Sequence, residues 1–185
     1  MNFLSITNEE LNSLDLKSQG NKIVSQEYRN YYFSNSGQEH YRLLTYISNN
    51  NDNIKLLDIG TLKGCSALAL SSNYKNKVFS FNLVNQLDLN EIPSNIEFII
   101  DNIMKTDYKN LLLESKFIML DTFHDGELEK EFYEYLKFIK FKGYLLLDDI
   151  YLNNNMEKFW NSIDNPKDDL TKIGHSTGTG IVYFE

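Results

Sequence analysis

The sequence predicts an α/β fold: a Rossmann-like, doubly wound sheet of seven strands, mostly parallel and ending in an antiparallel hairpin. Two observations predict it. Short apolar runs with almost no polar interruption alternate with segments of helical period, a pattern typical of parallel strands joined by crossover helices. The final apolar run follows a turn rich in glycine, threonine and serine instead of a helix, which favours a C-terminal hairpin.

The expected strands follow one another in a definite order. Five runs read as buried parallel strands: residues 54–59, 77–83, 96–100, 116–121 and 143–148. The last strand is expected at residues 181–184 (IVYF), after a turn at residues 175–180. Residues 170–174 precede that turn and are its expected antiparallel partner.

Between the strands, apolar side chains recur at helical spacing. Residues 38–48 form one predicted helix, in which Leu43, Leu44 and Ile47 face inward. Two later helices present apolar faces: Leu128, Phe132, Leu136 and Ile139 within residues 127–141, and Met156, Phe159, Trp160 and Ile163.

Size and composition limit the possibilities. The 185 residues suit one domain, with a core at residues 38–185 and a preceding segment, residues 1–37, expected to form a helical cap, a lid or a homodimer contact. The single cysteine, Cys65, excludes an intrachain disulfide. No apolar run approaches the length of a membrane span, so we expect a cytoplasmic protein without a membrane partner.

The charge of the chain bears on its partners. A net charge of −8 disfavours nucleic acid, because affinity for a phosphate backbone depends on clustered lysine and arginine. We therefore expect a small-molecule substrate.

The most informative segment is LLDIGTLKGCSALAL, residues 56–70. Asp58 closes a strand, Gly60 and Gly64 shape the following loop, and Ser66 opens a helix. A strand that leads through a glycine loop into a helix is where α/β sheets bind nucleotide-like cofactors, since glycine lets the backbone approach the ligand.

A dinucleotide is disfavoured as that cofactor. The dinucleotide fingerprint needs a glycine in the middle of the loop, where this chain has Leu62. It also needs an acidic residue after the second strand, where this chain has Asn82.

Asp58, Gly60 and Gly64, together with the strand order, resemble the class I S-adenosylmethionine-dependent methyltransferases over roughly residues 38–185. The resemblance implies the methyltransferase fold and S-adenosylmethionine as cofactor. It also implies that the loop packs against the methionine part of that cofactor.

Individual site residues follow from the same resemblance. Asp58 would organise the loop and contact the cofactor's ammonium group, often through water. Thr61 and Ser66 would donate hydrogen bonds to its carboxylate, helped by the helix N-terminus. Asp101 and Asn102 stand where the family reads the adenine, although Asp101 could equally cap a helix before Ile103.

Asn82 departs from the family pattern. The family usually has aspartate or glutamate there, which accepts hydrogen bonds from both ribose hydroxyls. An amide binds less strongly than a carboxylate, so we expect cofactor affinity to be weaker by roughly 1–2 kcal/mol. This departure keeps open an alternative, a degenerate, non-catalytic cofactor-binding or assembly protein.

Three carboxylates form a second candidate group. Asp121 closes the fourth strand, and Asp148 and Asp149 close the fifth. Parallel neighbours deliver such side chains to one edge of the sheet, where their mutual repulsion calls for a hard divalent cation, Mg²⁺ or Ca²⁺. The alternative is that each aspartate caps a helix or a loop.

The segments LDTFHDG and LLLDDI are similar to those of two groups of metal-dependent O-methyltransferases, the catechol type and the macrocin type. That resemblance implies that Asp121, Asp148 and Asp149 hold the metal. It also places His124 where the catechol type has its lysine base, so His124 would take the proton of the acceptor hydroxyl. Asp121 would be a catalytic residue as well as a metal ligand. The alternative for His124 is a solvated loop residue or a helix cap.

Two other histidines receive weaker expectations. His40 lies beside an apolar helical face and is expected to be structural, with a place in the wall of the acceptor pocket as the alternative. His175 and Thr177, near the last turn, could face the same edge of the sheet but carry no assigned role. A methyltransferase with a protein or nucleic-acid acceptor is the remaining alternative function.

Overall fold

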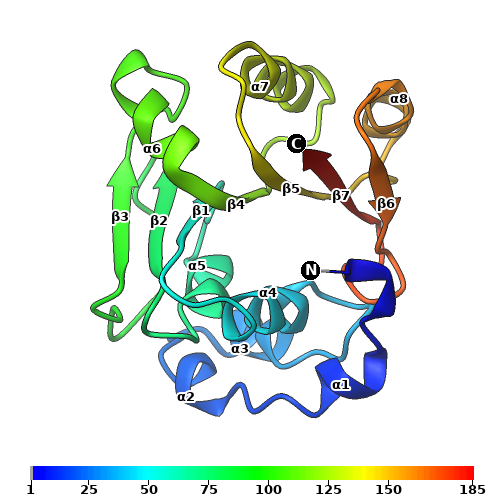
Figure 1. Cartoon of the computed structure of the whole chain (residues 1–185). Helices are drawn as coiled ribbons and strands as arrows, with labels where there is room; N and C mark the ends of the chain where they lie inside the picture. The colour runs from blue at the N-terminus through cyan, green and yellow to red at the C-terminus, as the bar shows by residue number, and fades with distance from the viewer. Residues whose placement is uncertain (1) are drawn as a thin grey trace.

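The computed structural model describes residues 2–185 and shows one seven-stranded sheet between two layers of helices (Figure 1). The strand order is β3-β2-β1-β4-β5-β7-β6, and β7 is antiparallel to both of its neighbours. The predicted fold class is therefore confirmed. The strands are β1 Lys55–Ile59, β2 Lys77–Asn82, β3 Ile96–Ile100, β4 Ser115–Leu120, β5 Gly143–Asp148, β6 Lys167–Asp169 and β7 Thr179–Phe184.

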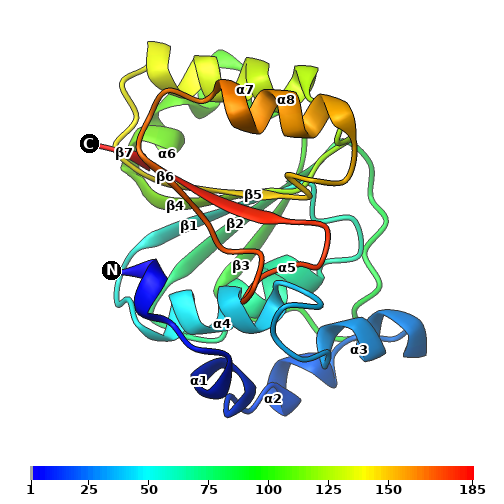
Figure 2. The same ribbon diagram turned by 90° about the vertical axis from the view of Figure 1, so that its right-hand side faces the viewer.

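Helices cover both faces of this sheet (Figure 2). One layer holds α1 Asn8–Asn12, α2 Lys17–Gly20, α3 Gln26–Tyr32, α4 Tyr41–Asn49 and α5 Cys65–Leu70, preceded by the short η1 Phe3–Ser5. The other layer holds α6 Lys109–Glu114 after η2 Thr106–Tyr108, then α7 Glu127–Phe138 and α8 Asn154–Ser162. Crossover helices alternate between the faces, as expected for a doubly wound sheet.

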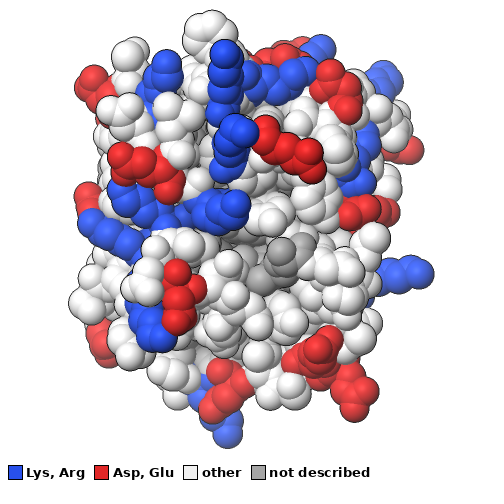
Figure 3. Space-filling view, in the orientation of Figure 1, with Lys and Arg blue, Asp and Glu red and all other residues white. Residues whose placement is uncertain are grey.

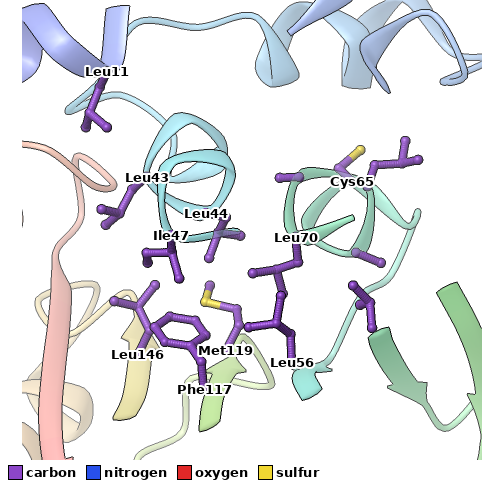
Figure 4. Close-up of a cluster of buried hydrophobic side chains, with 14 of the residues drawn as sticks. Leu11, Leu43, Leu44, Ile47, Leu56, Cys65, Leu70, Phe117, Met119 and Leu146 are labelled. Carbon is purple, nitrogen blue, oxygen red and sulfur yellow. The ribbon is translucent and has the colours of Figure 1, made fainter. Parts of the chain in front are cut away.

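Apolar side chains fill the space between each helix layer and the sheet. On the α4 side, Leu43, Leu44 and Ile47 are all buried, as the helical spacing predicted, and Leu44 and Ile47 point toward Met119 of β4 and Leu146 of β5 (Figure 4). On the opposite side, the predicted apolar faces of α7 and α8 are buried at Phe132, Leu136, Ile139, Met156, Phe159, Trp160 and Ile163, and Leu128 is half-buried. Helix α7 ends three residues before the expected boundary, because Lys140 adopts a left-handed conformation (φ 59°).

The predicted partner strand of the final hairpin, residues 170–174, is wrong. The partner is β6, Lys167–Asp169. Strand β6 lies at the edge of the sheet, and its side chains are charged, as is common for edge strands, so it lacks an apolar signal. Leu170 and Ile173 look like strand residues but are buried in the turn that follows β6.

Residues 2–37 are largely helical and pack below α4 and α5 (Figure 1). The guanidinium of Arg42 donates hydrogen bonds to four backbone carbonyls of this segment, those of Leu11, Leu14, Phe33 and Ser34, at 2.8–3.3 Å. Val24 also donates its backbone N–H to the carbonyl of Asp88 at 2.9 Å. The segment is thus tied to the core, and its role as a lid or dimer contact stays a prediction.

The face of the molecule seen in Figure 3 carries basic side chains over its upper half, with acidic side chains among them. Within residues 2–185, none of the helices is long and apolar enough to cross a lipid bilayer.

Candidate functional site

The loop after β1 owes its two glycines to packing. Gly60 and Gly64 have φ values of 95° and 92°, a conformation that side chains rarely adopt. A Cβ on Gly60 would lie 1.5 Å from the backbone oxygen of Asp121, and one on Gly64 would lie 2.9 Å from the side chain of Leu89. The two glycines were expected to let the backbone approach a ligand. In the structure they are also needed because protein atoms already occupy the space where a Cβ would lie.

Three predicted cofactor residues lie behind this loop. Asp58 is fully buried and accepts a hydrogen bond from Ser80 on β2 at 2.8 Å. Burial raises the pKa of Asp58, and the neighbouring hydroxyls of Ser66, Ser80 and Thr61 counteract that rise. Thr61 and Ser66 are buried as well, and the hydroxyl of Thr61 has no hydrogen-bond partner among residues 2–185.

A cavity of about 760 Å³ opens beside the loop at the carboxyl ends of β1, β2 and β4. Four predicted cofactor residues line it: Gly60, Asn82, Asp101 and Asn102. Asp58, Thr61, Gly64 and Ser66 do not line it. The structure thus brings half of the predicted cofactor residues onto one wall and sets the other half behind that wall.

Asp101 is held by its own neighbours. Its carboxylate accepts hydrogen bonds from Lys105, from the backbone N–H of Asn102 at 2.8 Å and from Tyr108 at 3.0 Å. Lys105 is the main cause of the lowered pKa of Asp101. No helix of the described chain begins at Ile103, so the predicted helix-cap alternative for Asp101 is wrong. The carboxylate instead ties down the loop that follows β3.

Asn82 and Asn102 also use their side-chain oxygens locally. The Oδ1 of Asn82 accepts from the backbone N–H of Leu83 at 3.1 Å, and that of Asn102 accepts from Met104 at 2.9 Å. The Nδ2 of Asn82 is buried and has no partner among the described residues. Burying an unpaired amide N–H is costly, so a small shift of Asn82 toward the cavity would give this donor a partner.

The other half of the site is a cluster of acids and imidazoles at the same edge of the sheet. It gathers all three histidines of the chain and four carboxylates: Glu39, His40, Asp121, His124, Asp148, Asp149 and His175. We call this set the acid–imidazole cluster. It draws on the segment before α4, on the ends of β4 and β5, and on the turn before β7.

His124 and Asp121 form the part of the cluster that faces the cavity. The Nε2 of His124 lies 3.3 Å from Oδ1 of Asp121 and 3.7 Å from Oδ2 of Asp149. His124 and Asp149 both have left-handed backbones, with φ values of 56° and 58°. The Glu129 carboxylate accepts the backbone N–H of His124 at 2.9 Å, which holds that strained turn in place.

Asp148 lies deeper, between two histidines. Its Oδ1 is 3.3 Å from Nδ1 of His40 and 3.4 Å from Nδ1 of His175. Asp149 contacts the same Nδ1 of His175, with its Oδ1 at 2.9 Å, and that Oδ1 also accepts a hydrogen bond from Thr177.

Ligand atoms within 4.8 Å of one another occur in two groups among the described residues. One comprises Asp121, His124 and Asp148, and the other comprises His40, Asp148 and His175. Of the three predicted metal ligands, Asp121 and Asp148 therefore converge, whereas Asp149 belongs to neither group. Metal binding at these residues stays a prediction.

The charges of the cluster are strongly coupled. Burial alone would lower the pKa of His40, but the charge of Asp148 and contact with it outweigh burial and raise that pKa to about 9. The pKa of His175 rises to about 10 against the effect of burial, because of Asp148 and Asp149. Burial and the neighbouring Asp148 raise the pKa of Asp121, whereas the two histidines hold the pKa of Asp148 well below its usual range despite burial.

The sequence-based prediction missed Glu39, took His40 as structural, and gave no role to His175, although it allowed that His175 could face this edge of the sheet. A signal for His175 did exist. The turn before β7 must reach the edge where β5 ends, since Asp148 pairs with Thr179. Nothing comparable marked His40, whose position depends on how α4 packs across the sheet.

No family model and no curated protein sequence matches this chain. Solved structures do resemble it. The SAH-bound methyltransferase PaMTH1 from Podospora anserina has a TM-score of 0.62 at 14% identity, with 100% of this chain and 88% of that chain covered. A candidate caffeoyl-CoA O-methyltransferase from Staphylococcus aureus has a TM-score of 0.57 at 13% identity, covering 98% and 94%. The cofactor-bound Rv0187 from MTB has a TM-score of 0.54 at 13% identity, covering 96% and 86%. At these identities the likeness shows the fold, the one that these methyltransferases share.

Proposed function

We propose that this chain is an S-adenosylmethionine-dependent methyltransferase that methylates a hydroxyl oxygen of a small acceptor with the help of a divalent cation. One observation carries the proposal. A single cavity of about 760 Å³ has the predicted cofactor residues Gly60 and Asn82 on its wall together with the acid–imidazole pair Asp121 and His124. A methyl donor and an acceptor hydroxyl could therefore meet in one space.

The residues of the cavity suit the cofactor. The unpaired Nδ2 of Asn82 would donate to a ribose hydroxyl, and Asn102 borders the space for the adenine. Asp101 would act mainly by shaping this wall, because its oxygens already accept three hydrogen bonds. Thr61 could reach the methionine end only after a shift of the loop, since its hydroxyl is buried behind it. The cofactor, when bound, supplies an electrophilic methyl group.

The residues of the acid–imidazole cluster suit the second half of the reaction. A divalent cation bound by the carboxylates of Asp121 and Asp148 would lower the pKa of an acceptor hydroxyl. His124 would accept the proton of that hydroxyl at Nε2, and Asp121 at 3.3 Å would stabilise the resulting imidazolium. The Nε2 of His124 is buried beside the cavity, so a shift of the ring would bring it to the acceptor hydroxyl.

The acceptor is proposed as a hydroxylated small molecule, either catechol-like or a sugar. Apolar side chains surround the cavity next to His124. Phe123 is 73% exposed and Leu83 is 57% exposed, and both line the cavity. A flat ring would cover such side chains on binding, which favours the catechol-like class.

Calorimetry and turnover together test the proposal. The purified chain is titrated with S-adenosylmethionine, then assayed for release of S-adenosylhomocysteine with panels of catechols and sugars, with a divalent cation and with EDTA. We expect cofactor binding and EDTA-sensitive turnover of at least one panel member. Cofactor binding without turnover on any acceptor would favour the non-catalytic alternative, for which the locally engaged Oδ1 of Asn82 is the structural support. Absence of cofactor binding would remove the proposal.

A further inference from the structure

Among the described residues, three side chains of the acid–imidazole cluster have buried polar atoms without hydrogen-bond partners: His40, His124 and Asp148. His40 and Asp148 are the most deeply buried of them. His40 is 2% exposed, and neither of its ring nitrogens has a hydrogen-bond partner among residues 2–185. Asp148 is 4% exposed, and its Oδ1 has no hydrogen-bond partner either. Polar atoms buried to this degree are normally satisfied, so Nδ1 of His40 and Oδ1 of Asp148, which lie 3.3 Å apart, call for a group that binds both.

The spacing of the ligand atoms suits a metal ion better than hydrogen bonds. Oδ1 of Asp148 lies 3.3 Å from Nδ1 of His40 and 3.4 Å from Nδ1 of His175, yet it is not aligned as an acceptor of either ring. Metal bonds of about 2.0–2.1 Å at tetrahedral angles separate neighbouring ligand atoms by about 3.3 Å. The three side chains come from separate parts of the chain, so the fold itself brings them together.

We infer that His40, Asp148 and His175 form a site for a first-row transition-metal ion such as Mn²⁺, Fe²⁺, Co²⁺ or Zn²⁺. Imidazole is a ligand for these ions, whereas Mg²⁺ and Ca²⁺ take oxygen ligands. The inference goes beyond the proposed function, because it places an imidazole-ligated ion on the buried His40 side of Asp148, next to the Asp121–Asp148 pair at the cavity. It rests on that function for the role of the ion in methyl transfer, but not for binding of the ion.

The surroundings of His175 support this assignment. On the side of the ring away from Asp148, the Nε2 of His175 faces the Glu39 carboxylate, with Oε2 at 3.8 Å. Metal-bound histidines commonly direct their second ring nitrogen to a carboxylate, which fixes the tautomer and strengthens the ligand. Asp149 and Thr177, now in contact with Nδ1, would hold the ring in place until a metal replaces the proton there.

The arrangement also divides the cluster between two tasks. Asp121 and His124 line the cavity, whereas His40 is buried and does not line it. Asp148 belongs to both groups of ligand atoms. A metal on the His40 side would leave His124 free to act as the base in the cavity.

Binding of Mn²⁺ to the full chain tests the inference. Metal is first removed by dialysis against a chelator, and the free Mn²⁺ signal in electron paramagnetic resonance is then followed during titration. Pulsed measurements on the bound ion count the ligating nitrogens. We expect one Mn²⁺ per chain, two nitrogen couplings, and retention of the ion in a tenfold excess of Mg²⁺.

Substitutions assign the ligands. H40Q and H175Q should each remove one nitrogen coupling and weaken Mn²⁺ binding by at least about tenfold, whereas H124Q should leave both couplings. Circular dichroism checks that each variant is folded. The nitrogen couplings of Mn²⁺ bound to the wild-type protein test the inference even if a variant does not fold. Absence of nitrogen couplings in the wild-type protein, displacement by Mg²⁺, or loss of a coupling in H124Q would overturn the inference.

The same samples separate this inference from the proposed function. Nitrogen-coupled Mn²⁺ without cofactor binding would remove the proposed function and leave the metal site standing. Methyl transfer supported by Mg²⁺, with no nitrogen coupling to Mn²⁺, would support the proposed function and overturn the inferred metal site.

Discussion

The two halves of the site are built in different ways. The wall around Gly60 and Asn82 borders an open cavity of about 760 Å³, and its polar atoms are mostly engaged with nearby backbone. The half around Asp148 is closed, with side chains of opposite charge packed 2.9–3.8 Å apart. The difference suggests that the first half depends on backbone shape and the second on charge, so substitutions should affect them separately.

The largest expected effect concerns the point where the two halves touch. Gly60→Ala would place a Cβ 1.5 Å from the backbone oxygen of Asp121, in a conformation with φ of 95°. Backbone cannot yield as a flexible side chain can, so we expect a loss of roughly 4 kcal/mol or more in the free energy of unfolding, or no folded protein. Urea denaturation measures it.

Gly37→Ala is the matched control for this substitution. Gly37 shares the left-handed backbone (φ 81°), but its Cβ would lie 2.8 Å from the carbonyl oxygen of Lys172. We expect this variant to fold with a smaller loss, about 1–2 kcal/mol. Both alanines would meet a backbone carbonyl, so equal losses in the two variants would contradict the larger effect expected from the closer contact with Asp121.

These contacts also show how far the sequence could predict the site. Gly60, Gly64 and Asp58 lie within a few residues of one another, so local spacing was enough to identify the loop. That spacing could not show that Asp121 fills the space beside Gly60, because the contact joins residues far apart in the chain. The reason for the glycine was therefore only partly predicted.

The acid–imidazole cluster was predicted in part for a similar reason. Asp121 and Asp148 stand at strand ends, and parallel strands bring their ends to one edge. His40 precedes a helix whose position comes from packing against β4 and β5, which no local pattern reports. His175 depends on the register between β5 and β7. Strand ends predicted the three aspartates and a short motif predicted His124, whereas Glu39, His40 and His175 required the folded structure.

The second prediction tests whether the two halves are separable. Asp121→Asn removes the charge that would stabilise a protonated His124, 3.3 Å away. We expect kcat to fall by about 10²–10⁴-fold, while the calorimetric affinity for S-adenosylmethionine changes by less than about threefold. Asp125→Asn is the control, because Asp125 caps the start of α7 and is exposed. A parallel loss of cofactor affinity in Asp121→Asn would contradict the division of the site.

The third prediction concerns pH and the closed half alone. In the metal-free protein, the raised pKa values of His40 and His175, about 9 and about 10, mean that folding favours their protonated forms. Their contribution to stability is complete below about pH 6.5, the pKa of an unfolded histidine, and is lost as the pH rises toward 9–10. The melting temperature should therefore fall by several degrees between pH 6.5 and 9.5.

The variant H40Q makes this pH effect specific. Its melting temperature should be lower than that of the wild type at pH 6.5, and it should fall less steeply with rising pH, since one of the two raised groups is gone. A slope as steep as that of the wild-type protein would place the titrating group elsewhere.

The smallest expected effect lies in the open half, at Asn82. A carboxylate at this position could accept hydrogen bonds from both ribose hydroxyls, so Asn82→Asp should tighten S-adenosylmethionine binding by about 5–30-fold, equivalent to roughly 1–2 kcal/mol. Calorimetry at pH 7.5 measures it, with Asn85→Asp on the following loop as a control for added charge. The new charge would also keep the acceptor for the backbone N–H of Leu83, which Oδ1 of Asn82 provides at 3.1 Å. Weaker binding in Asn82→Asp would mean that the site uses the amide itself, through its buried and unpaired Nδ2, and that the departure from the usual acidic residue is an adaptation of this chain.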